Sequence, residues 1–192
     1  MSRALRSKPL FWLLLALPAI PMIAAALQPG ADLEELLHPT GEWSARFLVI
    51  ALALTPLVLL FPGNPVLRWL VARRRAIGVA AFGYAALHTL LYVVAMGNLD
   101  DMLAEIGATG IWSGWLAMLL FVPLALTSND ASVRALRAGW KTLQRLAYPA
   151  ALLTLLHWVT VHDGLDGALV HFVPLALLQL VRLTRRRAPA AA

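Results

Sequence analysis

Apolar residues in this chain occur in long blocks, and polar and charged residues gather between them. Six blocks approach the length at which a helix crosses the hydrocarbon core of a bilayer, roughly 17–25 residues. They cover residues 10–27, 47–61, 77–96, 111–126, 146–161 and 168–183. The pattern predicts an all-α polytopic membrane protein. We expect one domain over residues 1–192, a bundle of six transmembrane helices with an unstructured tail at 184–192.

Several blocks contain proline, which would argue against a helix in a soluble protein. Membrane helices tolerate proline because neighbouring helices and side chains satisfy the backbone groups that it frees. The prolines concerned are Pro18, Pro21, Pro56, Pro123, Pro149 and Pro174. We therefore expect kinked helices in these blocks.

The first block has a second interpretation, because Arg3, Arg6 and Lys8 ahead of an apolar run are also typical of a secretory signal peptide. Its apolar run of about 18 residues is longer than the roughly 7–15 residues of a signal-peptide core. This length favours a membrane helix, and cleavage would leave the orientation of the other five blocks unchanged.

The charged residues sort into two sets of loops and helix ends. Fifteen of the 16 lysines and arginines lie in segments 3–8, 68–75, 134–145 and 182–187. Nine of the ten acidic residues lie in segments 28–46, 97–110 and 162–167, where Arg46 is the one basic residue. Basic loops stay on the cytoplasmic side of a membrane. We therefore expect both termini to be cytoplasmic and the acidic segments to face outward.

Composition excludes several classes of function. Hydrophobic residues make up 60% of the chain and charged residues only 14%, with a mean hydropathy of +0.74. The chain has no cysteine, which excludes disulfides, zinc thiolate sites, iron–sulfur clusters and thiolate-ligated haem. The net charge of +6 comes from the basic helix ends, so it predicts membrane topology and not nucleic-acid binding.

Two of the blocks carry a histidine at matching depth. His88 and His157 each lie about 11 residues into an expected helix, roughly 16 Å from its cytoplasmic end. Ionisable residues inside a bilayer are costly and usually functional. Small residues precede each histidine on its helix face: Ala81 and Ala85 before His88, and Ala150 before His157. They leave room for a flat macrocycle. Two imidazoles are common axial haem ligands, which favours electron transfer. The alternative is that each histidine only hydrogen-bonds a neighbouring helix.

The other histidines are weaker candidates. His38 and His162 fall in or beside outer loops, where solvation explains them. His171 is one turn into the last block and is a candidate substitute ligand or partner of a haem propionate. Arg46 is a further candidate propionate partner. An i, i+4 pair with Glu42 is the simpler interpretation of Arg46, and we favour it.

Four stretches carry a family resemblance. They are TGEWSARFLVIALALTPL at Thr40–Leu57, RRRAIGVAAFGYAALHTLLY at Arg73–Tyr92, LALTSND at Leu124–Asp130 and WKTLQRLAYPAALLTLLHWV at Trp140–Val159. In this order they resemble the MsrQ (YedZ) family, the haem-binding membrane subunits of a periplasmic protein-methionine-sulfoxide reductase system. That family lies within the ferric reductase-like transmembrane superfamily. The resemblance covers nearly the whole chain.

The resemblance implies a haem b with His88 and His157 as the axial ligands of its iron, and an FMN whose site the sequence does not place. It implies electrons drawn from the quinone pool or from a cytoplasmic flavin reductase. It also implies a heterodimer with a periplasmic molybdopterin methionine sulfoxide reductase catalytic subunit, which repairs oxidised envelope proteins. The chain would then lie in the bacterial inner membrane, in contact with lipid, and hold no catalytic residue for the sulfoxide chemistry.

One residue departs from the family pattern. Gln144 stands where the family usually has a histidine at the cytoplasmic end of the fifth helix. It lies 13 residues before His157, roughly 20 Å along a helix, so it cannot replace His157 at the same haem. Because an amide is a poor iron ligand, we expect a single haem.

Two rival functions stay open. A stand-alone transmembrane ferric or quinone reductase would share the haem and need no molybdenum partner. A small transporter with metal-binding or proton-carrying histidines would be colourless when purified. The chain has no G-x-G-x-x-G motif for a dinucleotide. Tyr84 and Tyr92 are neighbours of the expected haem or simple packing residues.

Overall fold

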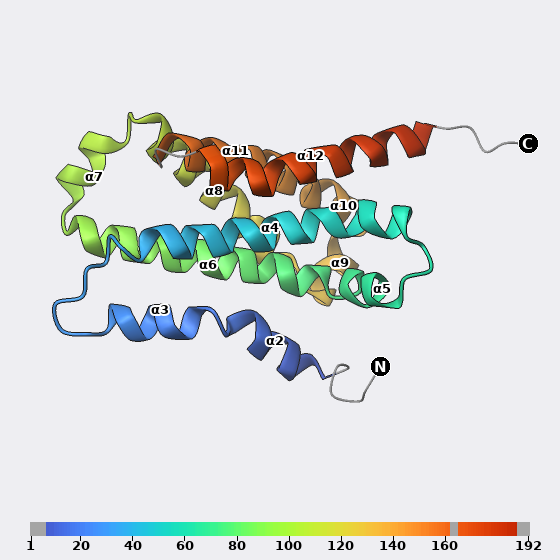
Figure 1. Cartoon of the computed structure of the whole chain (residues 1–192), viewed down its shortest axis with the longest axis horizontal. Helices are drawn as coiled ribbons and strands as arrows, with labels where there is room; N and C mark the ends of the chain where they lie inside the picture. The colour runs from blue at the N-terminus through green and yellow to red at the C-terminus, as the bar shows by residue number, and fades with distance from the viewer. Residues whose placement is uncertain (1–6, 162–164, 188–192) are drawn as a thin grey trace, which may run out of the picture.

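The computed structural model describes residues 7–161 and 165–187, and within them every regular element is a helix (Figure 1). The α-helices in chain order are α2 (Lys8–Ala16), α3 (Ala19–Ala26), α4 (Leu37–Leu60), α5 (Pro65–Val71), α6 (Arg74–Met96), α7 (Leu99–Glu105), α8 (Thr109–Leu126), α9 (Asp130–Leu136), α10 (Ala138–Leu143), α11 (Ala147–Val161) and α12 (Leu165–Arg187). A short 3-10 helix, η1 (Gln144–Leu146), precedes α11. The all-α prediction is confirmed. His162 and the tail residues 188–192 lie outside the described residues.

Four of the described helices are long and apolar enough to cross a membrane: α4, α6, α8 and α12. The pair α2 and α3 makes a fifth candidate if it is one bent span. α11 has only 15 residues, fewer than the other candidates. Six spans therefore stay a prediction. α12 also continues over residues 184–187, which were expected to belong to the tail.

The first block is not one straight helix. α2 ends at Ala16, α3 begins at Ala19, and the two helices are bent by 49°. Pro18 lies between them, and proline both lacks an N–H donor and clashes with the preceding turn. By contrast, Pro56 and Pro174 lie inside continuous helices. The break shows that only the first proline-containing block is interrupted in the described residues.

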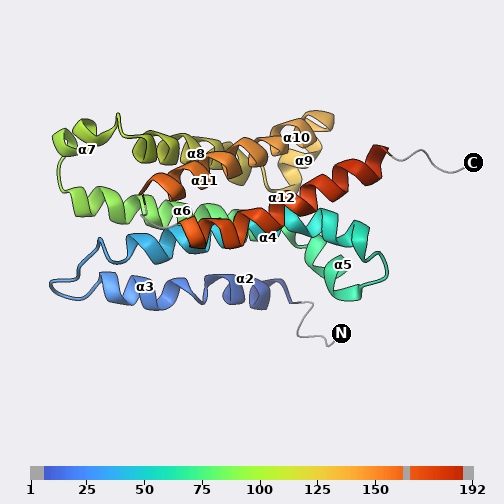
Figure 2. The ribbon, with the colours of Figure 1, turned by 45° about the horizontal axis from the view of Figure 1, so that its top comes forward.

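Two helix pairs form the body of the bundle. α4 packs mainly against α6, and α8 packs mainly against α11, while α12 lies along α4 (Figures 1 and 2). Ala45, Ala81 and Ala150 are fully buried, and such small side chains let helix backbones approach closely. The Ser44 hydroxyl donates to the Ala81 carbonyl at 2.9 Å, which ties α4 to α6. The seam between the two pairs is where α6 meets α8.

The two ends of the bundle differ in charge. α7 lies at one end, together with the start of α4, and we call this the α7 end (Figure 1). α5, α9 and α10 lie at the other, with the first turn of α2 and the last turn of α12, and we call this the α9 end. The basic helix ends of the described chain gather at the α9 end and its acidic segments at the α7 end. The fold thus brings each set of charges together.

Candidate cofactor site between two histidines

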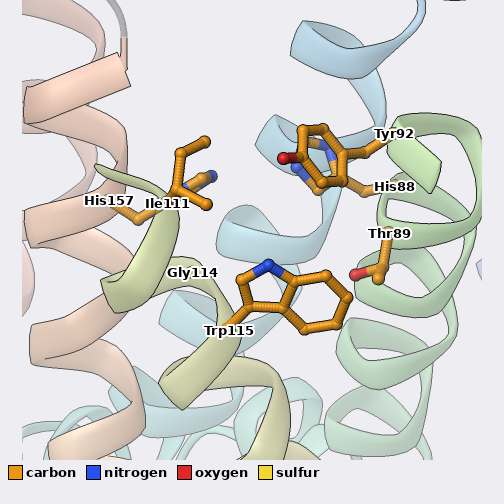
Figure 3. Close-up of a pocket in the computed structure, with 7 residues that line it drawn as sticks. All are labelled: His88, Thr89, Tyr92, Ile111, Gly114, Trp115 and His157. Carbon is orange, nitrogen blue, oxygen red and sulfur yellow. The ribbon is translucent and has the colours of Figure 1, made fainter. Parts of the chain in front are cut away.

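His88 and His157 lie side by side across the seam between the two helix pairs (Figure 3). α6 supplies His88 and α11 supplies His157. Their ring centroids are 5.8 Å apart, with an angle of 83° between the ring planes. Two imidazoles that share a metal ion at bonds of about 2 Å place their rings at a similar separation. The structure therefore brings together the two histidines that the sequence placed at equal depth.

The hydrogen bonds of His88 fix which ring nitrogen carries the proton. Its Nδ1 lies 2.9 Å from the Leu37 carbonyl oxygen and 3.4 Å from Thr40 Oγ1. A carbonyl can only accept, so Nδ1 is the donor and the neutral ring keeps its lone pair on Nε2. Both partners belong to α4, so the helix pair α4–α6 orients this ring by itself.

His157 repeats this arrangement in the other helix pair. Its Nδ1 donates to the Gly110 carbonyl oxygen of α8 at 2.7 Å, which leaves the Nε2 lone pair available. Metal-bound histidines usually donate their second ring N–H to a carbonyl or carboxylate, which fixes the tautomer and the orientation of the ring. Both histidines thus have the hydrogen bond that a metal-ligating imidazole needs.

Glycines make room for both rings. A Cβ atom at Gly114 would lie 2.7 Å from His157 Nδ1, closer than real contacts allow. A Cβ atom at Gly41 would lie 3.2 Å from His88 Nδ1. Sequence reasoning missed both residues. The spacing of Gly110 and Gly114, one turn apart, is the small-xxx-small pattern of close helix contact, and it could have drawn attention to this helix.

A pocket of about 60 Å³ adjoins the two rings. Its lining is mostly apolar and comes from α6, α8 and α11: His88, Thr89, Tyr92, Ile111, Gly114, Trp115 and His157 (Figure 3). Ligand sites for drug-sized molecules occupy about 300–1,000 Å³, so a porphyrin needs more room than this pocket has. The donor atoms and the apolar lining fit a haem. Side chains on the seam, Ile111 and Trp115 among them, would have to turn aside to admit it.

A second and larger cavity lies toward the α9 end, with a volume of about 680 Å³, and we call it the basic chamber. Five cationic side chains line it: Arg74, Arg75, Lys141, Arg145 and Arg182. The polar side chains in its lining include Thr55, Ser128, Trp140, Gln144, Tyr148 and Gln179. Sequence reasoning missed this chamber, because it treated these basic residues only as topology signals.

Arg182 is the chamber residue with unused donor capacity. Its Nη1 donates to the Tyr148 hydroxyl and, at 3.2 Å, to Gln179 Oε1. Its Nε is buried and has no hydrogen-bond partner among the described residues. A buried guanidinium donor without a partner is costly, and phosphate or carboxylate oxygens are the acceptors it matches best. The chamber is therefore suited to an anion.

Comparison with known proteins identifies the family of this chain. The family model described as "Ferric reductase like transmembrane component" matches residues 40–155, a range that includes His88 and ends two residues before His157. The chain belongs to the ferric reductase-like transmembrane family, and within it to the MsrQ family. A protein of Rhizobium meliloti named "Protein-methionine-sulfoxide reductase heme-binding subunit MsrQ" is 37% identical over 93% of this chain and 85% of its own length.

Further MsrQ relatives carry the same name. One from Xanthomonas euvesicatoria is 39% identical over 73% of this chain and 65% of its own length. Another, from Agrobacterium fabrum, is 35% identical over 82% of this chain and 71% of its own length. No solved structure matches the chain.

His171, a candidate substitute ligand, belongs to a separate cluster. Its Nδ1 donates to the Gly167 carbonyl at 2.6 Å, and its Nε2 accepts from Arg46 Nε at 3.4 Å. Arg46 also pairs with Glu42 at 2.6 Å, which confirms the i, i+4 pair favoured from the sequence. The His171 ring lies against Trp158, with centroids 5.4 Å apart. With both its nitrogens engaged, His171 is not poised to replace either histidine of the seam.

The remaining sequence candidates lie elsewhere. His38 is exposed, and its ring lies 6.3 Å from that of Trp158. Gln144, the departure from the MsrQ pattern, lines the basic chamber. Its Nε2 donates to the Leu124 carbonyl and to Thr127 Oγ1, both at 3.2 Å. In the described part of the chain, no three His, Asp or Glu side chains gather into a metal-ion cluster.

Proposed function

We propose that this chain is the haem-binding electron-transfer subunit of a protein-methionine-sulfoxide reductase system. The observation that carries the proposal is that His88 and His157 line one pocket with ring centroids 5.8 Å apart, each imidazole held by a backbone carbonyl through Nδ1. The names of the MsrQ relatives support it, because each is described as heme-binding and as a subunit of such a reductase.

His88 and His157 would hold a haem b through their imidazole nitrogens. The haem iron would supply one-electron redox chemistry. If both imidazoles bound the iron, they would favour electron transfer over the binding of an external ligand. The glycines opposite the rings keep both imidazoles in one orientation. The apolar walls exclude water, which limits the rearrangement of charge during each transfer.

We propose an orientation with the α9 end in the cytoplasm of a bacterial inner membrane. The basic residues at this end and the acidic residues at the other match the positive-inside rule. In this arrangement α11 and the bent pair α2–α3 complete six spans. Electrons would enter from the quinone pool or a cytoplasmic flavin reductase. They would leave toward a periplasmic molybdopterin methionine sulfoxide reductase that acts on oxidised envelope proteins.

We propose that the basic chamber binds FMN. Five cationic side chains and the partnerless Nε of Arg182 suit the phosphate of a flavin mononucleotide. The chamber volume of about 680 Å³ leaves room for a flavin ring system. The amide of Gln144 is a poor iron ligand, so this cavity favours an organic cofactor over a second haem.

The visible spectrum of the detergent-purified protein, oxidised and then reduced with dithionite, tests the proposal. We expect the bands of a six-coordinate b-type haem in the wild type and their loss in both His88→Ala and His157→Ala. His171→Ala is the matched control, because His171 lies outside the seam, and it should keep the colour.

Other outcomes would contradict the proposal. A colourless wild type, grown with ample haem, would favour a transporter with histidine metal or proton sites. A red protein that needs no molybdenum partner to pass on electrons would favour a stand-alone ferric or quinone reductase. If the haem spectrum survives in His157→Ala and disappears in His171→Ala, His171 and not His157 is the second haem ligand.

A further inference from the structure

Tyr92 places a hydroxyl group at the histidine pocket. It follows His88 by one turn of α6 and lines the same pocket. Its hydroxyl points across the pocket toward Ile111, away from its own helix (Figure 3). The Tyr92 ring packs edge-on against Trp115, with centroids 6.4 Å apart and an interplanar angle of 74°. The neighbouring aromatic ring therefore limits where the hydroxyl can turn.

The Tyr92 hydroxyl is buried and has no hydrogen-bond partner among the described residues. The exposed Glu105 carboxylate of α7 is the competing acceptor: it is close enough to act on the hydroxyl both electrostatically and as a hydrogen-bond acceptor, although the contact falls outside ordinary hydrogen-bond geometry. A buried hydroxyl without a partner costs free energy, and native proteins rarely leave one so. Another tyrosine of the same helix, Tyr84, shows the usual solution, since its hydroxyl donates to the Leu15 carbonyl at 3.0 Å.

The missing acceptor matches the group proposed for this pocket. In a haem b, the only oxygen atoms are those of the two propionate carboxylates. Resting on the proposed function, we infer that the Tyr92 hydroxyl donates a hydrogen bond to a propionate of the haem held by His88 and His157. Tyr92 is then a cofactor-binding residue, and the hydrogen bond adjusts the reduction potential of the iron.

The direction of the effect follows from charge. A propionate carries a negative charge close to the iron, and this charge favours the ferric state. A donated hydrogen bond spreads that charge and so favours the ferrous state. Removing the hydroxyl should therefore lower the reduction potential of the haem. The histidine ligands would be unchanged, so the six-coordinate spectrum should remain.

Tyr92→Phe in the purified, haem-loaded full chain tests the inference. Redox titration should show the equilibrium constant for haem reduction falling about threefold to tenfold, in line with the loss of one hydrogen bond. Resonance Raman spectra should show a shift of the propionate bending band. Tyr84→Phe is the matched control on the same helix. It removes a satisfied hydroxyl and should lower the thermal stability while leaving both haem readouts unchanged.

Glu105→Gln separates the two possible acceptors. It should leave the reduction potential and the Raman band at their wild-type values. If it reproduces the changes of Tyr92→Phe, the hydroxyl belongs to Glu105 and the inference fails. An unchanged potential and Raman band in Tyr92→Phe would also overturn it, while the red colour of that protein would leave the proposed function intact.

Two further outcomes are decisive. If Tyr92→Phe loses its haem, Tyr92→Gln restores a donor at the same position. Recovery of haem in that variant supports the inference, and a second colourless protein overturns it. A colourless wild type would overturn the proposed function and this inference together. When only the inference fails, the wild-type protein still binds haem.

Discussion

The two cavities of this bundle differ in volume and in the chemistry of their walls. The histidine pocket at the seam measures about 60 Å³, has mostly apolar walls and includes two imidazoles, each held through Nδ1 by a backbone carbonyl. The basic chamber measures about 680 Å³ and presents five cationic side chains among polar ones. A metal ion needs fixed lone pairs at short distances, whereas a phosphate needs concentrated positive charge. The walls of the two cavities therefore suit two different kinds of ligand.

The largest expected effect concerns the fixed geometry of the smaller site. Gly114→Ala would put a Cβ atom 2.7 Å from His157 Nδ1 and push the ring out of position. We expect haem occupancy to fall by about tenfold or more, as when groups that orient metal ligands are altered. The haem-to-protein absorbance ratio of the purified protein measures this. Gly83→Ala is the matched control, since a Cβ atom there meets nothing within 4 Å. Equal haem content in the two variants would contradict the role given to Gly114.

A loss of charge should affect only the larger cavity. Arg182→Gln removes the guanidinium donor that lacks a partner, and we expect FMN to bind about tenfold more weakly. Riboflavin, which has no phosphate, should lose little affinity. Flavin fluorescence titration of the variant and of the wild type measures the affinities for FMN and for riboflavin. The haem spectrum should not change. Arg185→Gln is a nearby control at an exposed position. If FMN and riboflavin weaken equally, phosphate recognition by Arg182 is excluded.

Gly41→Ala should have a smaller effect than Gly114→Ala. Its Cβ atom would lie 3.2 Å from His88 Nδ1, so the ring must give way by only a few tenths of an ångström. Overpacking of this kind costs about 1–3 kcal/mol of stability. We expect the haem to stay bound, with a lower thermal midpoint and a small shift of its absorption maximum. A complete loss of haem would mean that the Gly41 contact with His88 is as tight as that of Gly114 with His157.

The smallest expected effect lies at the rim of the basic chamber. Arg75 pairs with Asp130 at 2.5 Å, and this hydrogen bond holds the pKa of the Asp130 carboxyl below its usual value. The pair therefore adds stability above the usual aspartate range near pH 4, and loses it as pH falls through the lowered pKa. Because the carboxylate is exposed, salt should weaken the effect. Thermal midpoints of wild type and Asp130→Asn should converge at acid pH and at high salt. If the difference between the two thermal midpoints widens toward acid pH, the Arg75–Asp130 pair is not the source of the stability.

The sequence predicted the helices and the sorting of charge because both follow from local patterns. It also placed His88 and His157 at one depth, since depth along a helix is a matter of counting residues. It did not predict that Pro18 would divide the first block, because a proline in a membrane helix permits both a kink and a break.

The sequence could not identify the surroundings of the site. The rotation of each helix and the choice of its neighbours decide that Gly114 faces His157 and Gly41 faces His88. The basic chamber draws its lining from α4, α6, α8, α10, η1, α11 and α12. No single stretch of sequence shows that Arg74 and Arg182 line one cavity. Only the packing of the helices shows which arginines share a cavity. In the sequence alone, the same arginines are equally well explained as topology signals.

The two imidazoles come from different helix pairs, His88 from α4–α6 and His157 from α8–α11. A metal bound by both would therefore cross-link the halves of the bundle. Because a ligand that binds only the folded state stabilises it by mass action, haem supply would set how much intact protein the membrane holds. In a cell short of haem, this cross-link would be missing, so the abundance of the folded chain would follow the abundance of its proposed cofactor.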